Sequence, residues 1–370
     1  MSYYSYKEID ETGAAYRLVI GQRSNGKTFG AIRKVIDCYL STGVPSAYIR
    51  RLEEQIKKKN LEDLLTPHCN YLIEKTGGEW NAFAYRSGAF YLALYVPNSA
   101  GRLILKAKDK NPILRCYAIN NAENTKGQDA GEVKYIIFDE FITRKYYLRN
   151  EFVQFQNLLS SIIRDRPGVV IYMLANSVNK YCPYFSDMGI KSVADMQQGT
   201  ISVYQLGQTD KKIAVEYCSM IDDDTKKEVS TYFAFDNPQL KMISSGEWEI
   251  ALYRYPPDDM ADYDIIFSFF VCYADKVVQG DIYMYKGYPL IVWHKKTTPL
   301  KHPDKDLIYC EDVTDGNPLH QIELAAGNTK PHKLIRQLIR ENKTFYDHND
   351  TGEIINNWLK FAMQSHVLKA

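Results

Sequence analysis

The sequence predicts an α/β fold for its first 200 residues, with a mostly parallel central sheet that is covered by helices. Residues 133–138 and 168–175 are apolar runs without alternation, as expected of parallel strands buried on both faces. Residues 152–163, which lie between them, have the spacing of an amphipathic helix. A glycine-containing loop at 21–28 connects a further strand to a further helix. This strand–helix–strand order favours a parallel sheet.

The other elements of this half are short and alternate in the same way. Strands are expected at 16–20, 46–50, 90–96 and 115–118, and helices at 29–40 and 52–65. A polar loop at 120–132 precedes the first of the two apolar runs.

The pattern changes near residue 197. Residues 197–247 contain short polar segments and an acidic run, which we interpret as a linker. Hairpin-like strands follow at 264–273, 280–285 and 288–294, with turns at 279–280 and 286–287, and helices at 333–342 and 354–367. We therefore predict an α/β domain at 1–196, a linker at 197–247 and a smaller α+β domain at 248–370.

Composition excludes several classes of protein. The chain has 370 residues, of which 45% are hydrophobic and 25% charged, so it is neither disordered nor collagen-like. Its seven cysteines form no C-x-x-C pair, which argues against a disulfide framework or a zinc module and fits a reducing cytosol. The most apolar stretch, 265–273, is only strand-length, and the first 13 residues are polar. We expect no membrane span and no signal peptide.

Charge is distributed unevenly although the net charge is only +1. Residues 1–200 hold 27 basic and 20 acidic residues, whereas 201–370 hold 19 and 25. If the partner is a polyanion, the first half is the better place for its phosphates. Candidate phosphate contacts are Arg50–Arg51 and the lysine runs at 57–59 and 106–110. No base-reading motif is visible, so contact with DNA would be through the backbone.

The strongest motif is a complete G-x-x-x-x-G-K-[ST] sequence. It consists of Gly21, Gln22, Arg23, Ser24, Asn25, Gly26, Lys27 and Thr28. Glycines allow the backbone N–H groups to point inward at phosphate oxygens, and the following helix adds its positive end. Lys27 is expected to reach the β- and γ-phosphates of a nucleotide, and Thr28 to ligate Mg²⁺.

A second motif, Asp139-Glu140, ends an apolar strand. Parallel strands place such residues at the carboxyl edge of the sheet, where α/β folds bind ligands. Asp139 is expected to hold Mg²⁺, and Glu140 to polarise the attacking water.

Three further polar residues follow. Arg164 and Arg166 come at the end of the 152–163 helix, and an arginine there could enter a neighbouring subunit's nucleotide site. Asn176 follows the next strand and could hydrogen-bond the γ-phosphate or the lytic water. The spacing alone is equally compatible with the two arginines lying at a solvated helix end and with Asn176 being an ordinary turn residue.

Together these segments resemble the genome-encapsidation ATPases of small protein-primed podophages. These are ring motors related to the additional-strand-catalytic-glutamate P-loop translocases. The resemblance covers residues 16–185 and rests on the following segments: Val19–Thr28, Tyr48-Ile-Arg50-Arg51, Ile136–Phe141, Arg164-Asp-Arg166, Ala175-Asn176-Ser177 and Pro183-Tyr184-Phe185.

The resemblance implies a P-loop NTPase that uses ATP and Mg²⁺ to move double-stranded DNA into a preformed procapsid. It implies a homo-oligomeric ring, a pentamer, docked on the portal in the host cytoplasm. It assigns catalytic roles to Glu140, to Arg164 as a finger acting on the next subunit, and to Asn176 as a sensor. Arg166, and Lys126 in the preceding polar loop, are further candidates for trans action.

For residues 248–370 the resemblance implies an RNase H-like domain. A nuclease of that kind needs clustered carboxylates for two metal ions, one of them on the first strand. The expected strand at 265–273 contains no acid. We therefore expect a vestigial nuclease fold that does not cleave DNA.

Two other functions are compatible with the motifs. The chain could be a P-loop kinase or nucleotide-dependent switch that does not act on DNA, although no N-K-x-D motif is present. It could also be a structural portal adaptor with an inactive loop. A rise in ATP hydrolysis on adding double-stranded DNA separates the motor from the kinase or switch, and binding of an ATP analogue would exclude the adaptor.

Overall fold

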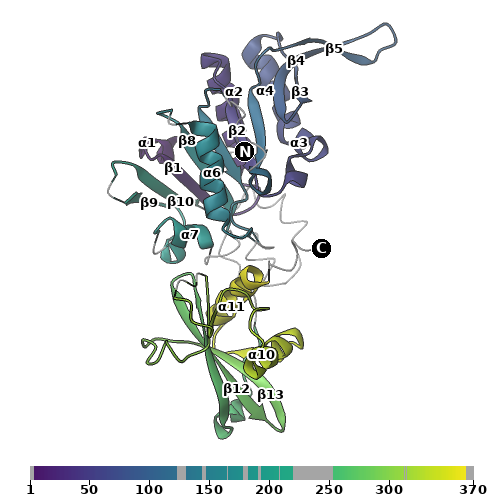
Figure 1. The fold of residues 1–370 in the computed structure, drawn as a ribbon. Helices are drawn as coiled ribbons and strands as arrows, with labels where there is room; N and C mark the ends of the chain where they lie inside the picture. The colour runs from purple at the N-terminus through teal and green to yellow at the C-terminus, as the bar shows by residue number, and fades with distance from the viewer. Residues whose placement is uncertain are drawn as a thin grey trace. The chain divides into compact units, whose positions relative to one another are not determined.

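The computed structural model describes residues 4–122, 131–143, 147–164, 166–177, 182–190, 193–207, 209–219, 253–311, 313 and 315–363. Lys126 and residues 220–252 lie outside the described residues. The chain divides into two compact units (Figure 1). The first comprises Met1–Ile142, Asn150–Val178 and Asp195–Glu247, and the second Thr143–Arg149, Asn179–Ala194 and Trp248–Ala370.

A ten-stranded sheet forms the centre of the first unit, in the order β3-β4-β6-β2-β7-β8-β1-β10-β9, with β5 paired to β4. The strands are β1 (Tyr16–Gly21), β2 (Ser46–Arg50), β3 (Ala82–Arg86), β4 (Ala89–Pro97), β5 (Leu103–Lys108), β6 (Leu114–Ala118), β7 (Tyr135–Asp139), β8 (Val170–Asn176), β9 (Thr200–Gln205) and β10 (Lys212–Tyr217). The six adjacent strands β6, β2, β7, β8, β1 and β10 run parallel to one another, which confirms the predicted fold class.

Helices cover both faces of this sheet. The helical elements are α1 (Lys7–Glu11), α2 (Lys27–Thr42), η1 (Glu53–Ile56), α3 (Lys58–Leu65), η2 (Thr66–His68), α4 (Cys69–Thr76), η3 (Ile119–Asn121) and α6 (Glu151–Ile163). Ile137 of β7 shares a core cluster with Ile32 and Val35 of α2. The next residue, Phe138, packs instead on Phe155 of α6, with ring centroids 4.9 Å apart. Because successive strand residues face opposite sides, α2 and α6 lie on opposite faces.

The region interpreted as a linker contributes two strands to this sheet. β10 pairs in parallel with β1, and β9 pairs antiparallel with β10. Ile213, Ala214 and Val215 are completely buried beside β1. Their apolar run is only three residues long between polar neighbours, too short to indicate a strand by itself. The linker prediction is therefore wrong for 200–217.

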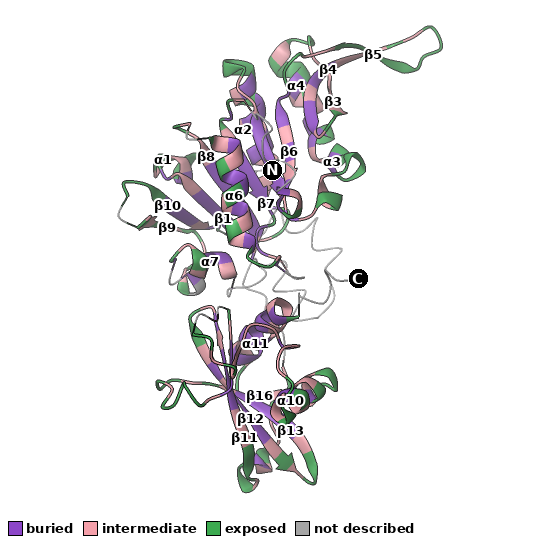
Figure 2. Ribbon diagram, in the orientation of Figure 1, coloured by how far each residue is buried: buried purple, intermediate pink, exposed green. Residues whose placement is uncertain are grey.

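The second unit is built on a six-stranded sheet in the order β15-β14-β11-β12-β13-β16. Its strands are β11 (Ile265–Tyr273), β12 (Lys276–Tyr285), β13 (Tyr288–Lys295), β14 (Ile308–Cys310), β15 (His320–Gln321) and β16 (Thr344–Tyr346). Its helical elements are α7 (Pro183–Asp187), η4 (Val193–Asp195), η6 (Asp258–Asp262), α10 (Lys330–Arg340) and α11 (Asn349–Ala362). Trp293 and Trp358 are fully buried in its core, which Figure 2 shows in purple.

Two segments that we placed in the first domain belong to the second unit. The Tyr147 hydroxyl donates to Cys182 Sγ at 3.4 Å, which joins residues 143–149 to residues 179–194. Ser186 donates to Asp275 at 3.3 Å, and Arg149 lies 3.5 Å from Glu323. These polar contacts connect residues far apart in sequence, so local patterns could not predict them.

One expected turn is a strand. Residues 279–280 lie inside β12, and the turn before that strand is formed by Ala274 and Asp275, with φ of 50° and 58°. Gly280 is required by packing. A Cβ at this position would lie 2.6 Å from Phe269 Cζ and 2.9 Å from Trp293 Cζ3. The expected turn at 286–287 is confirmed, with φ of 46° and 83°.

None of the helices in the described part of the chain has the length and apolarity needed to cross a bilayer.

Gly280→Ala should destabilise the second unit by about 1–3 kcal/mol, because the added methyl group overlaps two buried aromatic rings. Denaturant unfolding monitored by tryptophan fluorescence measures this change. Gly287→Asn is the matched control, since asparagine tolerates the left-handed conformation of an open turn. Equal stability of the two variants would contradict the packing explanation.

Candidate functional site

Three parallel strands bring the predicted site residues to one edge of the first unit's sheet. β8 lies between β1 and β7, with Gly21 opposite Asn176 and Asp139 opposite Leu174. The two motifs, whose nearest members Thr28 and Asp139 are 111 residues apart in sequence, therefore end side by side at the carboxyl edge.

The loop at 21–28 begins at the end of β1 and leads directly into α2. Ser24 and Gly26 have positive φ values of 61° and 86°, which bend the loop into the start of the helix. Gly21 has no room for a side chain, since a Cβ would lie 2.8 Å from Cys218 Cβ. The residues before β1 also pack on the loop. Tyr4 donates its N–H to Asn25 O at 3.0 Å, and Tyr6 donates its hydroxyl to Lys27 O at 2.7 Å.

Lys27 is folded onto the loop and is only 6% exposed. Its ammonium donates to Gln22 O at 2.7 Å, to Asn25 Oδ1 at 3.0 Å and to Gly21 O at 3.3 Å. Asn176 Oδ1 lies 3.5 Å away. Burial lowers the pKa of Lys27 to about 8. The lysine is thus held by the groups that surround the expected phosphate position.

Asp139 is buried next to the first turn of α2. The Thr28 hydroxyl lies 3.2 Å from both carboxylate oxygens, and the Tyr48 hydroxyl donates to Oδ2 at 2.9 Å. Burial raises the pKa of Asp139, although Arg50 and the Tyr48 hydrogen bond oppose this effect. A hydroxyl and a carboxylate are the hard oxygen ligands that Mg²⁺ takes while keeping waters and phosphate oxygens. The donor set therefore fits Mg²⁺.

Glu140 reaches the same pocket in an uncommon backbone conformation, with φ of 58°. Its carboxylate is ion-paired with Arg50, whose other terminal nitrogen lies 3.5 Å from Asp139 Oδ2. The Glu140 side chain is 54% exposed, so water can reach it. Thr28, Asp139, Glu140 and Asn176 all line a pocket of about 220 Å³ beside the loop.

The two arginines at the end of β2 are not available to DNA in this structure. Arg50 is paired with the two acids, and Arg51 is 5% exposed and paired with Glu151. The sequence analysis gave them as candidate phosphate contacts and as part of the family resemblance, and it did not connect them with the two acids. Their position after the strand next to β7 was the signal for their place beside Asp139 and Glu140.

Arg164 and Arg166 lie at the other end of the sheet. Arg164 follows the last turn of α6 and precedes β8, so it is near the amino end of that strand. The Arg166 guanidinium donates to Gly131 O, just before β7. Neither residue joins Lys27 within the same chain.

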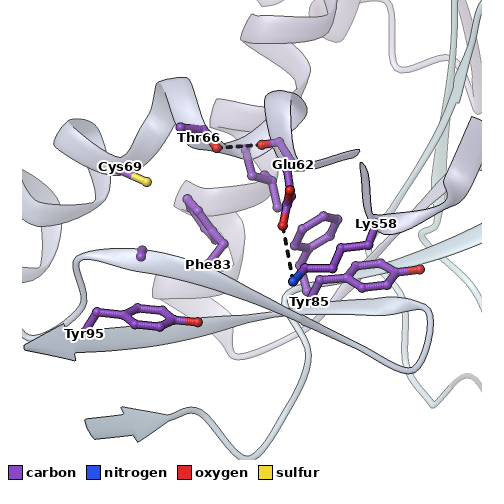
Figure 3. Close-up of a pocket in the computed structure, with 10 residues that line it drawn as sticks. Lys58, Glu62, Thr66, Cys69, Phe83, Tyr85 and Tyr95 are labelled. Atoms are coloured by element: carbon purple, nitrogen blue, oxygen red, sulfur yellow. Dashed lines mark hydrogen bonds and ion pairs between the residues drawn. The ribbon is translucent and has the colours of Figure 1, made fainter. Parts of the chain in front are cut away.

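A second pocket, of about 270 Å³, lies between α3–α4 and β3–β4 (Figure 3). Phe83, Tyr85 and Tyr95 contribute aromatic walls, and Lys58 and Glu62 are ion-paired at 3.3 Å on its rim. It is separate from the residues of the loop site.

Comparison with known proteins agrees with this geometry. Residues 110–222 match the family of the podovirus DNA encapsidation protein (Gp16). The solved structure titled the Phi-28 gp11 DNA packaging motor is 19% identical, with a TM-score of 0.57, and the match covers 97% of this chain and 98% of that one. The bacteriophage Phi-29 viral genome packaging motor assembly is 17% identical, with a TM-score of 0.54 and 96% of both chains covered. No curated protein matches the sequence. The resemblance inferred from the sequence is therefore confirmed: the chain matches the podovirus DNA encapsidation family over residues 110–222 and has the fold of phage DNA-packaging motors over nearly its whole length.

Proposed function

We propose that this protein is the ATP-hydrolysing subunit of a viral genome-packaging motor, which moves double-stranded DNA into a procapsid. The observation that carries the proposal is the meeting of Lys27, Thr28, Asp139 and Glu140 in one pocket. The family match and the shared fold support the same function. We further propose that the subunits form a pentameric ring on the portal, in the host cytoplasm.

The loop supplies the groups that bind ATP. Inward N–H groups and the start of α2 attract the phosphates, and Lys27 exchanges its loop carbonyls for phosphate oxygens. Thr28 and Asp139 would hold Mg²⁺, which supplies charge stabilisation for the β- and γ-phosphates when bound. Asn176, beside Lys27, is placed to contact the γ-phosphate.

Glu140 is the proposed general base. Its partly exposed carboxylate lies at the rim of the pocket, where it can orient and deprotonate water. The ion pair with Arg50 occupies that carboxylate, so Arg50 has to release it before hydrolysis.

Arg164 is at the opposite end of the same chain's sheet, which supports its action on a neighbouring subunit. Arg166 and Lys126 remain secondary candidates for that role.

DNA contacts are proposed for exposed lysines of the first unit. Lys57, Lys58 and Lys59 are exposed, as are Lys106 on β5 and Lys110 just after that strand. The β4–β5 hairpin extends from the body of the unit (Figure 1). Such contacts neutralise phosphates without reading sequence, so binding should weaken steeply with salt. A rise in ATP hydrolysis on adding double-stranded DNA, reversed by salt, tests the function. A flat response would favour a nucleotide-dependent switch.

We propose that the second unit keeps an RNase H-like architecture without cleaving DNA. Asp281 on β12 is 2% exposed and accepts hydrogen bonds from Ser268 and Gln279, while His294 lies 2.6 Å from its other oxygen. The partners lower the pKa of Asp281 despite its burial. Because protein groups occupy both oxygens of this carboxylate, it is not available to hold a catalytic metal ion.

Glu140→Gln should reduce the DNA-stimulated kcat by about 10²–10⁴-fold, because the base is lost while the loop remains intact. Binding of an ATP analogue should stay within about twofold of the wild type. Lys27→Ala should instead weaken analogue binding. Glu79→Gln, which changes an exposed carboxylate of the same unit, is the control. Normal turnover by Glu140→Gln would contradict the assignment of the base.

Affinity for an ATP analogue should fall as the pH rises above about 8. Lys27 in the free protein loses its proton through its pKa of about 8, whereas bound phosphates favour the charged form. Binding above this pH then requires uptake of a proton, which weakens affinity by up to about tenfold per pH unit. Titration calorimetry between pH 7 and 9.5 measures the slope. Lys27→Arg, which stays charged, should give a flat profile if Lys27 is responsible.

Mixed rings test whether Arg164 acts across subunits. Arg164→Ala subunits retain Glu140, and Glu140→Gln subunits retain Arg164, so some interfaces in a mixture contain both groups. Mixtures should recover part of the DNA-stimulated hydrolysis that either variant lacks alone. Absence of recovery at every mixing ratio would argue against trans action.

A further inference from the structure

Arg51 holds the backbone turn that carries Glu140. Its guanidinium donates to Glu140 O at 3.1 Å and to Phe141 O at 2.8 Å. The Phe141 N–H donates to Leu174 O at 3.2 Å, so the turn is also attached to β8. A left-handed φ at a glutamate persists only where its surroundings enforce it. Arg51 is therefore part of what sets the direction of the Glu140 side chain.

A buried carboxylate fixes Arg51 in turn. Arg51 Nε lies 3.0 Å from Glu151 Oε1 and 2.8 Å from Oε2, and the two residues are 5% and 4% exposed. Burial of both charges offsets much of their attraction, so the pair is weak evidence for stability. The planar guanidinium has a fixed geometry, and contacts on three of its nitrogens orient it closely.

Glu151 is also the first residue of α6. Phe155, one turn further, packs on Phe138 of β7, which ties the start of the helix to the strand of the catalytic acids. α6 then continues as a rigid element for about 20 Å and ends at Arg164. One buried ion pair thus joins the backbone of Glu140 to the helix that carries Arg164.

We propose that Arg51 and Glu151 form a positioning pair, which fixes the backbone turn that carries Glu140 and transmits a change at Glu140 along α6 to Arg164. Nucleotide turnover in one subunit would then move the arginine that serves its neighbour. This inference rests on the function proposed above and goes beyond it, because it names the residues that connect successive sites. Neither residue of the pair lines the pocket that Glu140 lines.

Turnover of Arg51→Lys and Glu151→Gln tests the positioning role. Each variant should lower kcat per folded protein at least tenfold and leave KM for ATP within twofold of the wild type. The double variant should have a kcat no lower than that of the less active single variant. Asp10→Asn is the control. It breaks the ion pairs of Asp10 with Arg17 and Lys34 in the first unit, and should lower Tm without changing kcat. Lower Tm with unchanged kcat in Arg51→Lys and Glu151→Gln would overturn the proposal.

Hydrogen exchange tests the transmission without requiring turnover. Binding of a non-hydrolysable ATP analogue to the full-length wild type should alter exchange of the amides at 160–164, at the far end of α6. The change should disappear in Glu151→Gln while analogue affinity is retained. An unaltered wild type, or a change that persists in Glu151→Gln, would overturn the link. If the wild type shows no DNA-stimulated hydrolysis, the proposed motor function is refuted instead. The exchange result does not depend on hydrolysis and tests the link along α6 separately.

Discussion

The parallel pairing of β1, β8 and β7 is the constraint on which the first unit depends. Leu18, Val19 and Ile20 of β1 are completely buried, as are Ile136 and Phe138 of β7. Polar groups that face the pocket therefore lie at the last strand residue or just after it, where backbone and solvent meet. The register aligns three such ends. A shift by one residue would turn buried side chains to the opposite face and separate the acids from the loop.

Much of this unit could be predicted from the sequence because local patterns specify it. The strand expected at 46–50 is observed as Ser46–Arg50, and the helix after the loop needed only its apolar spacing and glycine boundaries. Lys27, Thr28 and Asp139 were also predictable, because a short motif encodes each position and the parallel sheet brings the motifs together.

The features that could not be predicted arise from contacts over long sequence separations. β10 is recognisable only beside β1, since its apolar centre is three residues long. Gly280 resembles a turn glycine until the rings of Phe269 and Trp293 are placed next to it. Arg50 is an ordinary basic residue in the sequence. Only the pairing of β2 with β7 brings its guanidinium next to the carboxylates of Asp139 and Glu140.

The contacts of Tyr4 and Tyr6 with the loop have a practical consequence for work on the isolated protein. The Tyr6 ring lies so close to Gly30 that a Cβ there would be 3.1 Å from it, and both tyrosines hydrogen-bond loop residues. Fusing another protein close to these tyrosines would therefore disturb Asn25 and Lys27, which line the pocket beside the loop. Such fusions should be cleaved before any assay.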